Sequence, residues 1–130
     1  MTGKKRVRAI TPYEDVYGYS RAIRVGSIIV VSGTTALDAQ GEIVAQNDIY
    51  AQTVLIIRKI EAALRELGAS LNDVVRTRIF TKDISRWQEI AKAHREVFGA
   101  TKPTATLVEV TNLIEANALV EMEVDAITES

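Results

Sequence analysis

Apolar residues recur at two spacings along the chain, and these spacings predict where helices and strands lie. In two long stretches they recur every three or four residues, as in a helix with one buried face. Elsewhere they alternate or form short runs rich in Val, Ile, Thr and Phe, which is typical of strands. The predicted helices span residues 48–67 and 84–98, and the predicted strands span residues 19–25, 28–31, 73–82, 104–110 and 119–127.

Polar residues and glycines mark the ends of these elements. Gly26 separates two apolar runs and predicts a β-hairpin. Asn47 or Asp48 is placed to cap the first helix, and Gly68 is placed to end it. Asp83 precedes the second helix as its cap. The predicted apolar face of that helix consists of Trp87, Ile90, Ala91, Val97 and Phe98, with His94 in the same stripe.

A short strand near the N-terminus completes the order β-β-β-α-β-α-β-β. This order predicts an α+β fold, with one mixed β-sheet and two helices on one face. The length suits a single domain over residues 1–130. Residues 28–31 are apolar at every position, so both faces of that strand are expected to be covered. Two helices cover one face only, and a second copy of the chain is expected on the other.

Composition removes several classes of function. The chain has no cysteine and one histidine, which excludes disulfides, thiolate catalysis and metal sites built from several histidines. The net charge of -1 argues against a nucleic-acid binder held by bulk charge. The basic residues 4–8 are interpreted as a solvated strand, with an RNA-contacting arm as the alternative. No apolar run fits a secretory signal or a membrane helix, so a cytoplasmic protein is expected.

Two sets of alternating charges stand on different strands. Glu121, Glu123 and Asp125 share one face of the last predicted strand. They are interpreted either as a carboxylate site, with one acid acting as general base or orienting water, or as the solvent-exposed face of a strand. Arg76 and Arg78 share a face of an earlier strand. They either pair with the acids across the sheet or present one arginine to a substrate carboxylate.

Three further features carry candidate chemistry. Tyr13, Tyr17 and Tyr19 cluster before the hairpin, where they either line a pocket or cap the sheet edge. Ser32 and Gly33 directly follow an apolar strand. A glycine there permits close approach of a ligand or of backbone, with neighbouring N–H groups able to receive an anion, or marks an ordinary strand-ending bulge or turn. His94 is interpreted either as a packing residue or as an acid or base that lines a cleft between subunits.

Taken in order and spacing, short segments over residues 17–127 resemble the YjgF/RidA family of small trimeric proteins. No single segment is decisive, whereas their combination is specific. The matching segments are residues 19–20, 22–26, 30–33, 52–53, 60–68, 71–75, 80–84, 98–99, 103, 108–110 and 119–123.

The resemblance implies a chorismate-mutase-like fold, in which a homotrimer forms a central β-barrel with the helices outside. A ligand cleft lies at each subunit interface. Active members hydrolyse enamine and imine intermediates, such as 2-aminoacrylate and 2-iminopropanoate, to keto acids and ammonia, and need no metal or organic cofactor. In such members a glutamate is thought to orient the water and an arginine holds the substrate carboxylate.

Position by position, the family's glutamate corresponds to Glu121, its tyrosine to Tyr19, and its Ser-Gly element to Ser32 and Gly33. The arginine is missing, because the family's Pro-Ala-Arg followed by Ser or Thr here reads Pro-Thr-Ala-Thr. Ala105 and Thr106 are the last two residues of this stretch. Two other cleft positions are also more apolar, namely Ala91 in place of an asparagine and Leu107 in place of a cysteine.

These differences leave two main hypotheses. The first is a hydrolase or deaminase of a small reactive metabolite with an atypical substrate, in which Glu121 positions the water. A further hypothesis is that Arg78 or His94 projects into the same cleft and replaces the lost arginine. The second is a non-catalytic module that binds a small ligand in the same clefts. The usual imino-acid deaminase activity is expected to be weak or absent, because a charged hydrogen bond to the carboxylate is worth about 1.5–3 kcal/mol. RNA cleavage, also attached to the family, has the least support from the acidic remainder of the chain.

Overall fold

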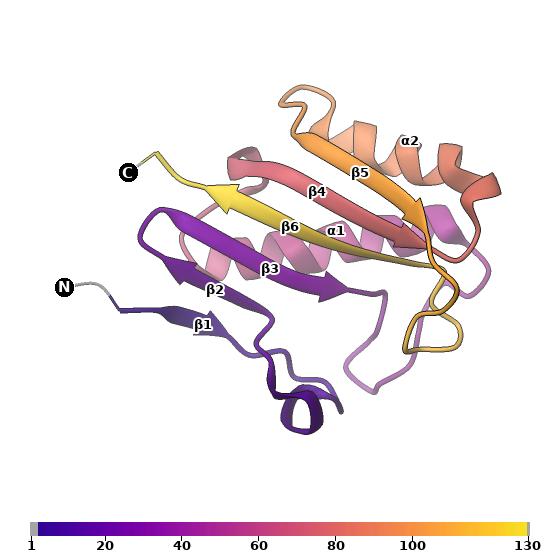
Figure 1. Ribbon diagram of the computed structural model, residues 1–130, viewed down its shortest axis with the longest axis horizontal. Coiled ribbons are helices and arrows are strands. Elements are labelled where there is room, and N and C mark those ends of the chain that lie inside the picture. The colour runs from indigo at the N-terminus through magenta and orange to yellow at the C-terminus, as the bar shows by residue number, and fades with distance from the viewer. Residues whose placement is uncertain (1–2, 130) are drawn as a thin grey trace.

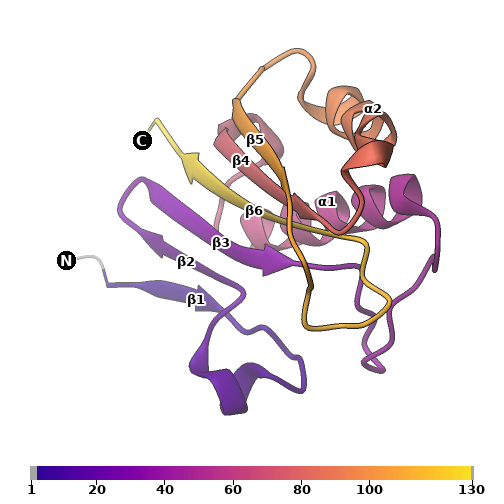
Figure 2. The same ribbon diagram turned by 45° about the vertical axis from the view of Figure 1, so that its right-hand side comes forward.

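The computed structural model describes residues 3–129 as one six-stranded sheet with both long helices on the same side (Figures 1 and 2). The strands pair in the order β1-β2-β3-β6-β4-β5, and only β4 and β5 are parallel. The predicted mixed α+β architecture and its order of elements are confirmed, whereas the trimer and its barrel stay predictions. The strands are β1 (Lys5–Val7), β2 (Ala22–Val25), β3 (Ile28–Thr34), β4 (Val74–Thr81), β5 (Thr104–Glu109) and β6 (Val120–Ile127).

The first helix, α1 (Ile49–Glu66), supplies most of the layer that covers the sheet. Its apolar residues at three- and four-residue steps, including Ile56, Ile60 and Leu64, are fully buried. Burial of each such side chain contributes about 1.5–3 kcal/mol. The Asp48 carboxylate accepts a hydrogen bond of 2.9 Å from the backbone N–H of Ala51, which confirms one of the two predicted caps.

The second helix differs from its prediction at its start and in its buried face. Asp83 caps a 3₁₀ turn, Ile84–Arg86, and only then does α2 (Trp87–Phe98) begin. Trp87 and Val97 are 48% and 39% exposed, so their assignment to the apolar face was wrong. The buried residues are Ile90, Ala93 and Phe98. The reason is that α2 packs chiefly against α1 rather than on the sheet, which leaves it a narrow buried face.

The sheet face without helices carries both apolar and charged side chains. Ile28 and Val30 are 54% and 46% exposed there, while Ile29 and Val31 are buried under α1. On the same face the predicted cross-strand pairing is present, with Arg78 donating to Glu123 at 2.9 Å. This pair is half-exposed and contributes about 0.2–1 kcal/mol. No helix within residues 3–129 is long and apolar enough to cross a membrane.

The buried side chain of Gln52 on α1 joins two loops at one end of the sheet. Its amide nitrogen donates to the carbonyls of Ala45 and Asn117, at 3.3 and 3.2 Å. Its amide oxygen accepts from the N–H of Leu119 at 2.9 Å. Gln52 therefore fixes the segment between β5 and β6 to the helix layer, and that segment carries one wall of the candidate site.

Replacing Gln52 by Leu is expected to lower the free energy of unfolding by about 2–3 kcal/mol, because three backbone groups lose their partner. Thr53→Val is the matched control, since it removes one hydrogen bond inside α1 and is expected to cost about 1 kcal/mol or less. Urea unfolding at a fixed protein concentration measures both. Equal losses in the two variants would contradict a joining role for Gln52.

Candidate functional site

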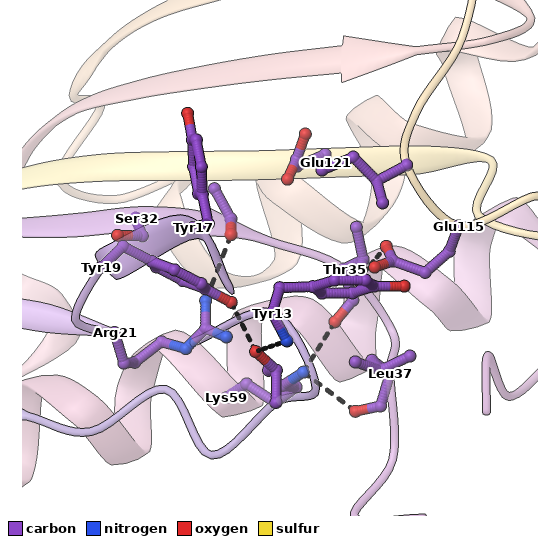
Figure 3. A pocket seen from close by; sticks show the side chains of 13 residues that line it. Tyr13, Tyr17, Tyr19, Arg21, Ser32, Thr35, Leu37, Lys59, Glu115 and Glu121 are labelled. Carbon is purple, nitrogen blue, oxygen red and sulfur yellow. Dashed lines mark hydrogen bonds between the residues drawn. The ribbon is translucent and has the colours of Figure 1, made fainter. Parts of the chain in front are cut away.

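A cavity of about 360 Å³ lies at the end of β3 and β6, and four of the predicted site residues line it (Figure 3). These are Tyr19, Ser32, Gly33 and Glu121. Other walls come from residues 11–21, from α1 and from the loop between β5 and β6. The volume falls within the range of pockets for small metabolites.

Glu121, near the start of β6, is held against the backbone of β3. The pairing of β3 with β6 is irregular between Val31 and Thr34, so the predicted bulge is present. At the bulge, a Cβ on Gly33 would lie 2.7 Å from Oε2 of Glu121. Glycine therefore lets this carboxyl group approach the strand, and any larger residue would require the Glu121 side chain to move. The predicted close approach was that of a ligand or of backbone, whereas the group found beside Gly33 is a side chain of the same protein.

The pKa of Glu121 is raised above its usual value. Burial is the main cause, followed by the negative charges of Glu115 and Glu123, while Arg21 acts in the opposite direction. A carboxyl group that keeps its proton to higher pH is a stronger base than an ordinary carboxylate. This property suits an acid–base group.

The donors of Ser32 are already used within the fold. Its N–H donates to the carbonyl of Arg21, and its hydroxyl donates to the carbonyl of Ser20, at 2.8 and 2.7 Å. The anion site predicted next to Gly33 therefore does not use the donors of Ser32. Ser32 instead joins the bulge to the segment that precedes β2.

All three tyrosines of the N-terminal cluster line the cavity, which favours the pocket over the sheet-edge interpretation. They flank or belong to a π-helical turn, Glu14–Gly18, that the sequence did not predict. The Tyr19 hydroxyl shares a hydrogen bond of 2.8 Å with Thr11, and the rings of Tyr17 and Tyr19 lie 5.7 Å apart. Burial, and then the charge of Glu115, raises the pKa of Tyr13.

Two cations in the cavity were missed by the sequence analysis. Arg21 is 8% exposed, and Lys59 reaches the cavity from α1. Burial, and after it the charge of Arg21, lowers the pKa of Lys59 to about 8. The signal for Lys59 was its position three residues after Ile56 and four before Ala63, which places it at the edge of the buried stripe.

Glu115 is a second carboxylate that was missed. It lies on the segment between β5 and β6, and its Oε1 accepts a hydrogen bond of 3.1 Å from the Thr35 hydroxyl. Nothing in the local pattern distinguishes it, because only the tertiary anchoring of that segment brings it to the cavity.

The other predicted site residues, except Arg78, line a separate apolar groove of about 240 Å³ between α2 and the strands β4 and β5, of which β5 is at the sheet edge. The His94 Nε2 lies 2.9 Å from the Thr77 hydroxyl oxygen, and its ring packs 4.7 Å from that of Phe98. Burial lowers the pKa of His94, which favours its neutral form. The predicted residues that line the groove are Ala91, His94, Ala105, Thr106 and Leu107.

Arg78 lines neither cavity. Its guanidinium lies 2.9 Å from Glu123 and 3.7 Å from Asp125. Within one chain, therefore, neither Arg78 nor His94 is placed beside Glu121 as a substitute for the missing arginine. No group of three or more His, Cys, Asp or Glu side chains that could hold a metal is found within residues 3–129.

The raised pKa of Glu121 predicts a pH-dependent effect on stability. The folded chain holds this proton more tightly than the unfolded chain, so the free energy of unfolding falls as pH rises through the pKa of the folded state. Glu121→Gln removes that loss. The variant is expected to be more stable than the native chain at pH 7, with the difference vanishing near pH 4.

The matched control is Asp125→Asn, four residues along the same strand, which loses an ion-pair partner of Arg76 and gains no stability. Thermal unfolding at several pH values measures both variants. A Glu121→Gln protein less stable than the native chain at pH 7 would contradict the unfavourable burial of this carboxylate.

Comparison with known proteins gives matches along nearly the whole chain. The family model described as Endoribonuclease L-PSP matches residues 9–128. A RutC family protein of Pyrococcus abyssi is 40% identical over 111 residues, which are 85% of this chain and 87% of that protein. The 3-aminoacrylate deaminase RutC of Acinetobacter baylyi is 32% identical over 104 residues, which are 80% of this chain and 82% of that protein.

Solved structures agree with these matches. The crystal structure of a member of the YjgF/YER057c/UK114 family from Mycobacterium tuberculosis is similar to this chain with a TM-score of 0.88 and 44% identity. The similarity covers 97% of this chain and 100% of that one. The family match spans both the cavity that contains Glu121 and the groove beside Ala105. The chain therefore belongs to the YjgF/RidA family, as its segments predicted.

Proposed function

We propose that this protein hydrolyses the carbon–nitrogen bond of a small imine or enamine metabolite, with Glu121 activating the water. The observation that carries this proposal is the half-buried carboxyl group of Glu121, which lies against Gly33 in the wall of a metabolite-sized cavity. Its raised pKa makes it a stronger base than an ordinary carboxylate, which suits a group that takes a proton from water.

In the proposed reaction, water adds to the carbon of the C=N bond, and Glu121 accepts a proton from that water. The nitrogen takes up a proton as its bond to carbon becomes single, which gives a carbinolamine. The nitrogen is protonated once more, the hydroxyl group loses its proton and the C–N bond breaks, releasing ammonia and a carbonyl compound. An enamine enters the same sequence after protonation at carbon.

The relative from Acinetobacter baylyi supports this class of chemistry, because 3-aminoacrylate is an enamine that carries a carboxylate. Family membership and the position of Glu121 point in the same direction. This chain differs from active members of the family at Ala105, which stands in place of their arginine and provides no cation in the apolar groove. Unless another cation in the cleft holds the substrate carboxylate, activity on the family's usual imino acids is therefore proposed to be weak and the physiological substrate to be atypical.

The proposal includes a homotrimer with a central β-barrel. The exposed apolar side chains on the helix-free face, Ile28, Val30 and Ile127, support burial of that face against other copies. In such an assembly the groove with His94 and Ala105 would meet the cavity of a neighbouring copy. Each complete cleft would then contain predicted site residues from two chains.

A non-catalytic binding module is the second candidate. The observation in its favour is the apolar groove formed by Ala91, Ala105 and Leu107, which lacks any charge to hold an imino acid. The two candidates make opposite predictions for Glu121, since a binding module has no need for an acid–base group.

Turnover is tested by release of keto acid and ammonia from a panel of freshly generated imines and enamines. Glu121→Gln is expected to lower kcat by about 10²–10⁴-fold, which is the usual contribution of general acid–base catalysis. Asp125→Asn, the control on the same strand, is expected to retain activity. Ala105→Arg is expected to raise turnover of 2-aminoacrylate about 10-fold or more through a charged hydrogen bond.

Native turnover that survives in Glu121→Gln would overturn the proposed role of this carboxyl group. Absence of turnover with the whole panel, together with binding of the same compounds, would establish the binding module instead.

The assembly is tested by sedimentation at several concentrations. The native chain is expected to have the mass of three copies, and Val30→Glu to have a lower mass, because it places a charge in the proposed interface. Arg58→Glu changes an exposed position on α1, away from that face, and is expected to remain trimeric. A native chain that sediments as a monomer would contradict the trimer.

A further inference from the structure

Arg21 and Lys59 bring two positive charges to one region of the cavity. In Figure 3 their cationic groups lie together, with Glu121 on the other side of the Tyr13 and Tyr19 rings. They are close enough that the charge of Arg21 contributes to the lowered pKa of Lys59. Two like charges held this close repel each other, and an anion placed beside both would relieve that repulsion.

Both cations are held by neutral oxygens rather than by carboxylates. The Nη1 of Arg21 donates to the carbonyl of Gly33 and to the hydroxyl of Thr34, at 3.1 and 2.9 Å. The Nζ of Lys59 donates to the carbonyls of Thr35 and Leu37, both at 2.9 Å. These contacts fix the positions of the two cations without neutralising them.

Five other arginines provide a contrast, whereas Arg24, like Arg21, is held by carbonyl and hydroxyl oxygens. Arg8, Arg65, Arg76, Arg78 and Arg86 each form an ion pair with a carboxylate. Among residues 3–129, Arg21 and Lys59 form none, although Glu115 and Glu121 line the same cavity. An incoming anion therefore does not have to displace an internal ion pair.

Donors remain for such an anion. Only Nη1 of Arg21 takes part in hydrogen bonds within residues 3–129, which leaves Nε and Nη2. An ammonium group has three donors, and Lys59 uses two of them. A carboxylate has two oxygens that match the planar edge of a guanidinium, and a nearby ammonium can donate to the same group.

We propose that Arg21 and Lys59 form a carboxylate-binding site, which takes over the role of the arginine that Ala105 replaces. The proposal rests on the proposed function, because it names the substrate class for the cavity that contains Glu121. The substrate then carries its carboxylate at Arg21 and Lys59 and its C=N carbon towards Glu121. Both recognition and water activation are supplied by a single chain.

The charges in the cavity define that substrate further. Its wall has two cations and two carboxyl groups, Glu115 and Glu121, so it suits a molecule with an anionic and a cationic end. A protonated imino acid has this form, since its carboxylate is negative and its iminium nitrogen is positive. A neutral imine of the same size lacks the anionic group and gains nothing from Arg21 and Lys59.

Binding can be measured apart from turnover with pyruvate, a keto acid product of this chemistry, and with its methyl ester. Calorimetry with the native protein is expected to show pyruvate bound about 10-fold or more tightly than methyl pyruvate. Lys59→Gln is expected to weaken pyruvate binding about 10–100-fold and to leave binding of the ester unchanged. Arg21→Lys keeps the positive charge but loses the planar guanidinium. It is expected to weaken pyruvate binding less than Arg21→Gln does.

Arg58→Gln is the matched control, because it removes a cation one residue away from Lys59 on the exposed side of α1. It is expected to bind pyruvate as the native chain does. The thermal midpoint of each variant shows whether it is folded. Arg21 also donates hydrogen bonds to Gly33 and Thr34, so Arg21→Gln can fail to fold. In that case the carboxylate-binding site is tested by Lys59→Gln alone.

Equal affinity for pyruvate and its methyl ester, no detectable binding of either, or an unchanged affinity in Lys59→Gln would each overturn the carboxylate site. Pyruvate binding that depends on Lys59 in a protein with no turnover would support this site and reject the hydrolase. Turnover that depends on Glu121 and is indifferent to Lys59 would support the hydrolase and reject this site.

Discussion

The pairing of β3 with β6 at the centre of the sheet is the constraint on which the rest of the structure depends. The alternate residues of both strands that face α1 are buried, and these strands form the floor of the core. The same pairing contains the bulge at Ser32 and Gly33, and the missing side chain at Gly33 leaves room for the carboxyl group of Glu121. The register between β3 and β6 therefore fixes both the packing of these strands against α1 and the position of the Glu121 carboxyl group.

The site combines two kinds of charge under different physical control. Glu121 is held against backbone and is disfavoured as an anion by burial and by two nearby acids. Arg21 and Lys59 are held by carbonyl and hydroxyl oxygens, which position a cation without cancelling its charge. Because the opposing groups do not form ion pairs, each remains available to a ligand. Partly buried charges that form no ion pair lower the stability of the folded chain. Such unpaired charges are typical of a binding site rather than of a structural cluster.

The fold was largely predictable because its signals are local. The buried stripe of α1, the cap at Asp48 and the alternation in β6 are all present in short stretches of sequence. The start of α2 was predicted three residues early, because the cap at Asp83 begins a 3₁₀ turn rather than the α-helix. The exposure of Trp87 follows from packing against α1, which periodicity alone does not reveal.

The candidate site was only half predictable. Glu121, Tyr19 and the Ser-Gly element came from the family resemblance, and the structure places them in one cavity. Arg21 and Glu115 became visible only with the tertiary structure, since contacts across the fold bring them there. The groove beside Ala105 lies apart from this cavity within one chain, so a complete cleft of both is a property of the assembly that we propose.

The most direct test of this account is a crystal structure of the protein grown with pyruvate. The account predicts the pyruvate carboxylate in contact with the guanidinium of Arg21 and the ammonium group of Lys59, with its carbonyl carbon facing Glu121. Pyruvate bound in the groove beside Ala105, with the cavity around Glu121 filled by water alone, would contradict it.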